Sequence, residues 1–127
     1  MTKIIHIFGN SLLENDNLAI KFIPALSHAF PDYQFIHQDP NDNLHPLNKE
    51  LIIIDAVEGI SSIKILHDID KIIDSPRFSM HDLDLGFTLK LLKKLDQLDQ
   101  VTIFCLPMSG DYDSLLKNLI AEIKKHL

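Results

Sequence analysis

Short apolar segments alternate with polar segments along the chain, and several have the length of a β-strand. The run of four apolar residues from Leu51 to Ile54 leads without interruption into Asp55. Continuous apolar runs of this length are typical of strands that are buried on both faces of a sheet. The residues that follow, up to Gly59, end the run. The pattern therefore predicts a central strand over residues 51–55, with Asp55 at its carboxyl end.

The remaining segments predict an α/β fold. Further strands are expected over residues 4–8, 33–37, 62–68 and 101–106, and helices over residues 18–30, 79–95 and 115–123. Pro24 falls inside the first helix and should kink or break it, because proline lacks the backbone N–H. Strands that alternate with helices favour a three-layer α/β/α sandwich with a five-stranded, mostly parallel sheet.

Composition narrows the classes of function. A chain of 127 residues suggests one domain over residues 1–127, and its net charge of −6 argues against nucleic acid or an anionic membrane as partner. No apolar stretch is long enough to span a membrane, and the N-terminus lacks the pattern of a secretory signal. The one cysteine, Cys105, lies in an apolar run and is expected in the core, which fits a reducing cytoplasm.

Two groups of polar residues are open to a structural interpretation. His6 lies in the middle of the first strand and is interpreted as a hydrogen-bonded histidine of the core or the sheet edge. Residues 38–48 are predicted to form a polar loop. The side chains in or beside it could form a metal cluster, but their spacing matches no defined metal motif, so solvated loop polarity is favoured. These side chains are His37, Asp39, Asp42 and His45.

Three side chains at comparable places in the predicted fold form a candidate metal site. Asp16 follows the first strand, Asp55 ends the central strand, and His81 begins a helix. Loops after parallel strands meet at the carboxyl edge of the sheet, where ligands bind in open α/β folds. Two carboxylates and an imidazole, with water, suit a borderline divalent ion. Asp16 alone also fits a helix N-cap, and Asp55 alone fits a cap of the following turn.

The local contexts of these residues resemble the hydrogenase maturation endopeptidases. The chain has Gly-Asn and two apolar residues before Asp16, an apolar strand and alanine around Asp55, and Ser-x-His at His81. The resemblance implies that Asp16, Asp55 and His81 are the metal ligands. It also implies an endopeptidase that removes the C-terminal extension of a nickel-iron hydrogenase large-subunit precursor, with nickel supplied by the precursor.

The chain departs from the family pattern in two places. The first position of the acidic pair is Asn15, and the glycines that usually follow the pair are replaced by Asn17 and Ala19. The glycine-rich turn after the second strand is replaced by a segment without glycine, in which Asp39 or His37 could stand in for the aspartate of the turn, with Asp39 as the candidate for the catalytic carboxylate. Asp39 also fits a simple turn before Pro40. The altered turn favours an alternative function, a non-catalytic metal-sensing or precursor-binding relative. A nucleotide site is disfavoured, because only Gly9 follows the first strand and no glycine-rich phosphate loop is present.

Overall fold

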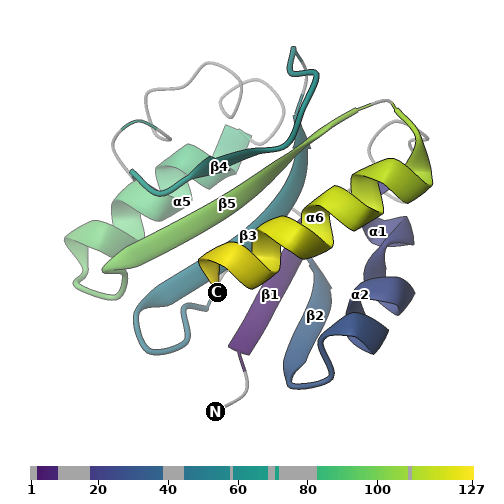
Figure 1. The fold of residues 1–127 in the computed structure, drawn as a ribbon. Coiled ribbons are helices and arrows are strands. Elements are labelled where there is room, and N and C mark those ends of the chain that lie inside the picture. The colour runs from purple at the N-terminus through teal and green to yellow at the C-terminus, as the bar shows by residue number, and fades with distance from the viewer. Residues whose placement is uncertain are drawn as a thin grey trace.

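The computed structural model of the chain describes residues 3–8, 18–38, 45–57, 59–68, 71, 83–108 and 110–127. Its strands and helices are arranged as the alternation of apolar and polar segments predicts (Figure 1). In chain order they are β1 (Lys3–Phe8), α1 (Leu18–Lys21), α2 (Ile23–Ala29), β2 (Tyr33–Gln38), β3 (Glu50–Val57), β4 (Lys64–Leu66), α5 (Leu83–Lys94), β5 (Gln100–Pro107) and α6 (Tyr112–His126).

The described strands form one sheet in the order β2-β1-β3-β5-β4. The pairs β1–β2, β1–β3 and β3–β5 are parallel, and β4 at the edge runs antiparallel to β5. This confirms the predicted five-stranded, mostly parallel sheet. The carboxyl ends of β1, β2, β3 and β5 consequently share one edge, which we call the carboxyl edge.

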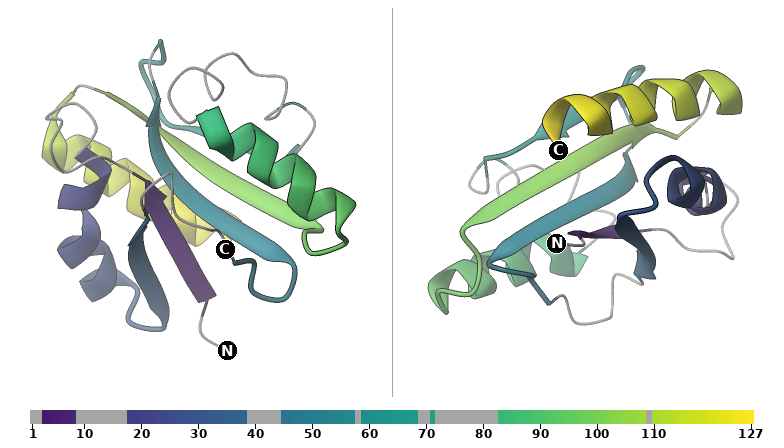
Figure 2. Two further views of the ribbon diagram at one scale, coloured as in Figure 1. Left: turned by 180° about the vertical axis from the view of Figure 1, so that it is seen from behind. Right: turned by 60° about the horizontal axis from the view of Figure 1, so that its bottom comes forward.

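Helices cover both faces of the sheet, as Figure 2 shows from two further directions. Helix α5 packs on one face, and α1, α2 and α6 pack on the other. Alternate residues of β3 divide between the two cores, because successive side chains of a strand point to opposite faces: Leu51, Ile53 and Val57 pack on the α5 side, and Ile52 and Ile54 pack on the α6 side. The three-layer sandwich is thereby confirmed.

The predicted first helix is broken at the position that Pro24 indicates. Helix α1 ends at Lys21, and α2 begins at Ile23 with proline in its first turn. Proline is tolerated there because the first N–H groups of a helix have no partner within the helix. Tyr112 of α6 fixes this junction: its hydroxyl donates to the carbonyl oxygen of Lys21 at 3.1 Å, and its ring lies 4.9 Å from that of Phe22.

Helix α5 ends in a hydrogen-bonded cap at the amino edge of the sheet. Asp96 has a positive φ of 58°, and the N–H groups of Asp96 and Gln97 donate to the carbonyl oxygens of Lys93 and Leu92. This is the Schellman arrangement, in which a residue in the left-handed region stops the helix. The helix therefore runs from the carboxyl edge, where it begins, to the amino edge, where Lys49 forms an ion pair with Asp96 at 3.3 Å.

Several element boundaries differ from the sequence-based expectation. Strand β3 continues to Val57, so Asp55 is the third residue from its end, and Gln38 belongs to β2, not to the following loop. Strand β4 is only three residues long, because among the described residues only Lys64, Ile65 and Leu66 pair with β5. Cys105 is buried beside α5, as predicted.

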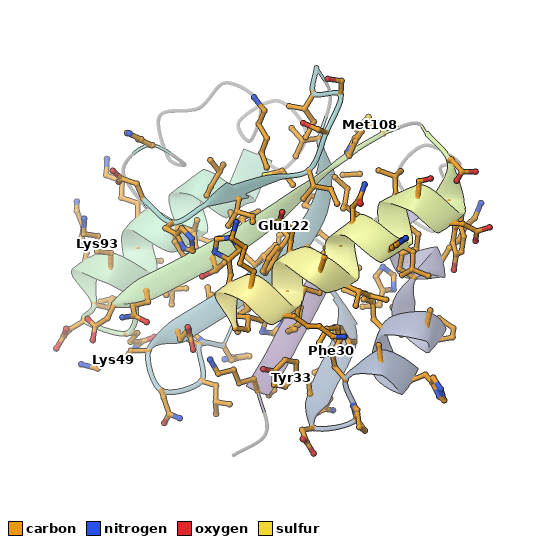
Figure 3. All side chains as sticks on the ribbon, viewed as in Figure 1. Phe30, Tyr33, Lys49, Lys93, Met108 and Glu122 are labelled. Atoms are coloured by element: carbon orange, nitrogen blue, oxygen red, sulfur yellow. The ribbon has the colours of Figure 1, made fainter. Side chains whose placement is uncertain are left out.

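The start of α6 has a clear local cause. The side chain of Asp111 accepts a hydrogen bond from the backbone N–H of Ser114 at 3.0 Å, which caps the helix and lowers the pKa of Asp111. Just before it, Gly110 has a φ of 143°, a conformation that side-chain-bearing residues rarely adopt. Below α6, the rings of Phe30 and Tyr33 stack 5.7 Å apart where the chain passes from α2 into β2 (Figure 3).

Candidate functional site at the carboxyl edge

Asp55 is a buried carboxylate in the carboxyl half of the central strand. Its exposed fraction is 7%, and the side chain interacts with its surroundings. The alternation along β3 places it on the α5 side of the sheet, and its pairing partner on β5 is Cys105. Burial of an ionised carboxylate is costly unless it is paired with a cation or hydrogen-bonded. Asp55 therefore either takes part in the chemistry of the site or forms hydrogen bonds or an ion pair that stabilise the fold.

The other three predicted site residues, Asp16, His81 and Asp39, lie outside the described residues. The elements on either side of them are described. Phe8 ends β1 and Leu18 begins α1, so the segment that contains Asp16 leaves the sheet at the carboxyl edge beside β3. Gln38 ends β2 at the same edge, immediately before Asp39 in the sequence. His81 precedes the first residue of α5, Leu83, by two positions.

Two further buried polar residues, which contact each other, lie on the same face of the sheet as Asp55. His6 and Gln38 have exposed fractions of 7% and 8%, and His6 Nδ1 lies 3.2 Å from Gln38 Oε1. Burial lowers the pKa of His6; the hydrogen bond with Gln38 opposes this shift, and the charge of His45 adds to it. His6 is thus neutral at neutral pH, and its interpretation as a hydrogen-bonded core histidine is confirmed.

Sequence reasoning missed Gln38, which it had assigned to a solvated loop. Only the structure shows its burial: Gln34, Ile36 and Gln38 share one face of β2, and burial along that face increases toward the carboxyl edge. His37 and His45, which had been considered for a metal cluster, are exposed. Asp39 and Asp42 of that cluster lie outside the described residues, so the cluster stays untested.

The described residues alone do not complete a metal centre. Among them, no group of three or more His, Cys, Asp or Glu side chains is placed to hold a metal ion. Of the three predicted metal ligands, only Asp55 lies within the described residues. A buried carboxylate at the edge where ligands bind in open α/β sheets is compatible with a divalent ion, and imidazole and carboxylate donors suit such ions.

Comparisons with known proteins identify the family. Residues 39–127, well over half of the chain, match the family model described as hydrogenase maturation protease. The chain belongs to the hydrogenase maturation protease family. The match includes Asp39, Asp55 and His81, and it begins after Asp16. A search of curated proteins gave no significant match.

Solved structures of similar fold agree with this membership. The hydrogenase maturating endopeptidase HybD from E. coli superposes with a TM-score of 0.67 at 17% identity, covering 97% of this chain and 93% of that chain. An endopeptidase from Escherichia coli gives a TM-score of 0.65 at 16% identity, covering 94% and 88%. An uncharacterized protein from Wolinella succinogenes gives 0.56 at 15%, covering 98% and 96%. At these identities the similarity establishes the fold of this hydrogenase maturation protease family member.

No helix among the described residues of this family member has both the length and the apolar character needed to cross a membrane.

Proposed function

We propose that this protein is an endopeptidase that removes the C-terminal extension of a nickel-iron hydrogenase large-subunit precursor after nickel insertion. Membership of the hydrogenase maturation protease family supports this function. The observation that carries it is the position of Asp55, a buried carboxylate on the α5 side of the sheet near the carboxyl edge. The lone, buried Cys105 fits action in a reducing cytoplasm.

In this proposal the nickel ion is part of the substrate. Asp16, Asp55 and His81 bind the ion that the precursor carries, and this contact docks the scissile bond. The topology supports the grouping: β1, which Asp16 follows, is paired with β3, and α5, which His81 precedes, covers the face on which Asp55 lies. Two carboxylates and one imidazole are ligands that borderline divalent ions accept.

The reaction is hydrolysis of one amide bond. Water adds to the carbonyl carbon of the scissile peptide, the C–N bond breaks, and the amine leaves with a proton. Asp39 is our candidate for the carboxylate that accepts the proton of the water or orients the substrate backbone, because it directly follows Gln38 at the carboxyl end of β2. General acid–base assistance of this kind contributes about 10²- to 10⁴-fold to the rate. A nearby cation would polarise the carbonyl and stabilise the negative charge that develops on its oxygen.

Incubation with a nickel-loaded large-subunit precursor tests this function. We expect the precursor to lose a C-terminal segment, which mass spectrometry of the intact subunit detects directly. The same precursor without nickel is the matched control and should keep its full mass. A precursor that retains its extension after prolonged incubation with the protein would contradict the endopeptidase function.

One observation favours a second function, that of a non-catalytic metal-sensing or precursor-binding relative. The chain has no glycine between Gly9 and Gly59, so the glycine-rich turn that the family resemblance implies for cleavage is replaced here. Stable binding of the nickel-loaded precursor without any loss of mass would support this function over hydrolysis. The fold alone does not decide between them.

Substitution of Asp39 separates the two functions at the level of one residue. Asp39→Ala should reduce cleavage by about 10²- to 10⁴-fold while nickel affinity is unchanged, because Asp39 is not among the proposed ligands. Asp42→Ala in the same segment is the matched control and should leave cleavage unchanged. If Asp39→Ala cleaves at the normal rate, Asp39 only begins the turn before Pro40.

A further inference from the structure

The buried polar side chains of the described residues are unevenly distributed over the sheet. They are His6, Gln38, Asp55 and Thr102. Thr102 pairs with Ile52 on the α6 side, near the amino edge. The other three lie on the α5 side. The proposed chemistry uses Asp55 and leaves the pair of His6 and Gln38 without a role.

The contact between His6 and Gln38 fixes the orientation of the Gln38 carboxamide. Gln38 Oε1 can only accept a hydrogen bond, so His6 Nδ1 carries the proton and donates it across 3.2 Å. His6 lies on β1, which is paired on both sides, and its exposed fraction is 7%. With Oε1 occupied, the other end of the carboxamide, Nε2 with its two N–H groups, is directed away from His6.

Gln38 Nε2 is a buried donor in need of an acceptor. The residue is more than nine-tenths buried, and among the described residues its side chain contacts His6 through Oε1, with no partner for Nε2. Buried donors are almost always hydrogen-bonded, because an unmade bond costs the full desolvation of the group. A carbonyl oxygen that arrives with a ligand would satisfy it.

The position of Gln38 brings this donor to the edge of the sheet at which Asp55 lies. Gln38 pairs with Phe8 of β1. Ile7 of β1 pairs with Ile54 of β3, so the next residues along these two strands, Phe8 and Asp55, are level with each other. Gln38 and Asp55 are thus two strand spacings apart, about 10 Å. Helix α5 lies across β3 and β5, and no described helix covers β1 and β2 on this face (Figure 2).

We propose that Gln38 binds the precursor peptide by donating a hydrogen bond from Nε2 to one of its backbone carbonyl oxygens, and that His6 is the residue that positions Gln38 for this contact. The inference rests on the proposed function, which supplies a peptide as the ligand. A separation of about 10 Å corresponds to about three residues of extended chain. The bound carbonyl therefore lies about the length of three extended residues from the place where Asp55 contacts the nickel ion of the precursor. A backbone contact leaves the side chain of the bound peptide residue unspecified.

Gln38→Leu tests the contact, because leucine has a similar volume and no polar group. We expect KM for the nickel-loaded precursor, and the Kd for its binding, to rise by about 3- to 10-fold, the effect of one lost hydrogen bond. We expect kcat to stay unchanged, because the contact is the same in the ground state and the transition state. Thr102→Val, at the buried polar residue on the other face, is the matched control and should change neither constant.

A second variant keeps the test valid if Gln38→Leu fails to fold. Gln38→Glu retains an oxygen that accepts from His6 and replaces the Nε2 donor with a second oxygen, which repels a carbonyl. Its KM and Kd should rise at least as much as those of Gln38→Leu.

The role of His6 has its own measurement. His6→Leu removes the donor that orients Gln38 and should raise KM with kcat unchanged, whereas His6→Asn, whose side-chain amide reaches nearly the same place as Nδ1, should restore KM. The double variant with Gln38→Leu should show no further increase, since both changes remove one contact. A purely structural histidine would give additive effects and no selective effect on KM.

The outcomes separate this inference from the proposed function. Cleavage with normal KM and Kd in both Gln38 variants would overturn the inference and leave the endopeptidase intact. Absence of cleavage, together with precursor binding that weakens in the Gln38 variants, would overturn the endopeptidase and support the inference. A fall in kcat at constant KM would also overturn the inference, and failure of the unmodified protein to bind the precursor would overturn both.

Discussion

The two faces of the central sheet use buried polar groups differently. On the α6 side, the core of Ile52, Ile54, Phe104 and their neighbours contains one buried polar residue among those that the structure describes. It is Thr102, whose Oγ1 contacts Nδ1 of the exposed His67 at 3.4 Å. That contact joins β5 to the residue after β4. It gives the Thr102 hydroxyl a hydrogen-bonding partner within the fold. Apolar burial is therefore the dominant stabilising contribution on this face.

On the α5 side, buried polar groups lie toward the carboxyl edge. Asp55 and Gln38 lie level with each other, and His6 is one row further in, level with Ile53. Closer to the amino edge, Leu51 and Val101 pair and belong to the apolar core with α5. This face is thus an ordinary core at one end and a polar cluster at the other. The difference indicates that the fold is stabilised mainly away from the carboxyl edge, where the proposed chemistry takes place.

Substitutions of two neighbouring residues that face opposite layers test this difference between the faces most directly. Asp55→Asn should abolish cleavage and lower nickel affinity by at least about 100-fold. Changing a residue that only contacts a metal ligand lowers metal affinity by up to about 100-fold, and Asp55 is proposed as a ligand itself. Ile54→Ala should instead lower the free energy of unfolding by about 2–5 kcal/mol, because Ile54 is fully buried in the α6-side core. Isothermal titration calorimetry and urea unfolding measure the two effects.

The reverse pattern would refute the assignment of Asp55. If Asp55→Asn destabilises the protein as much as Ile54→Ala does while nickel affinity is unchanged, Asp55 is a structural group. The near-equal size of aspartate and asparagine makes the comparison fair, because packing is conserved and only the charge is removed.

A change of pH tests the buried histidine of the α5 side. Because burial lowers the pKa of His6 below its usual 6.5, the unfolded chain binds a proton that the folded protein does not bind between the two values. The free energy of unfolding is therefore at its full value above the unfolded-state pKa and decreases as the pH falls through about 6.5. His6→Asn should flatten this dependence in urea unfolding at about pH 7.5 and about pH 5.5. An equal loss in both proteins would show that other groups cause it.

Much of the fold was predictable because its signals are local. The apolar run before Asp55 and the break at Pro24 each depend on a few consecutive residues, and both predictions were confirmed. The extension of β3 to Val57 was not predictable in this way, since it depends on pairing with β5 out to Pro107. Tertiary pairing, not the residues themselves, decides where that strand ends.

The candidate site was predictable only in part. Asp55 was found because a carboxylate at the end of an apolar run contrasts with its neighbours, and the structure buries it on the α5 side of the sheet. Asp16, His81 and Asp39 stay predictions, because they lie outside the described residues. Gln38 was missed because a neutral amide beside a polar segment has no local signal. Its burial depends on His6, which is 32 residues away in the sequence.

The smallest expected effect concerns the α6 side, where polar contacts should contribute only to structure. Tyr112→Phe removes the hydroxyl that donates to the carbonyl oxygen of Lys21 and keeps the ring beside Phe22. The contact is solvent-exposed, so its loss should lower the free energy of unfolding by about 0.5–1 kcal/mol. Tyr33→Phe is the matched control, since the chain has two tyrosines and the stacking of Tyr33 on Phe30 does not depend on its hydroxyl. Urea unfolding of both variants measures the difference. Because this contact lies at the end of α1, away from the face of Asp55, the KM of Tyr112→Phe for the precursor should equal that of the unmodified protein. A rise in KM as large as that of Gln38→Leu would show that the two faces are coupled through α1, and the functional contrast between them would then fail.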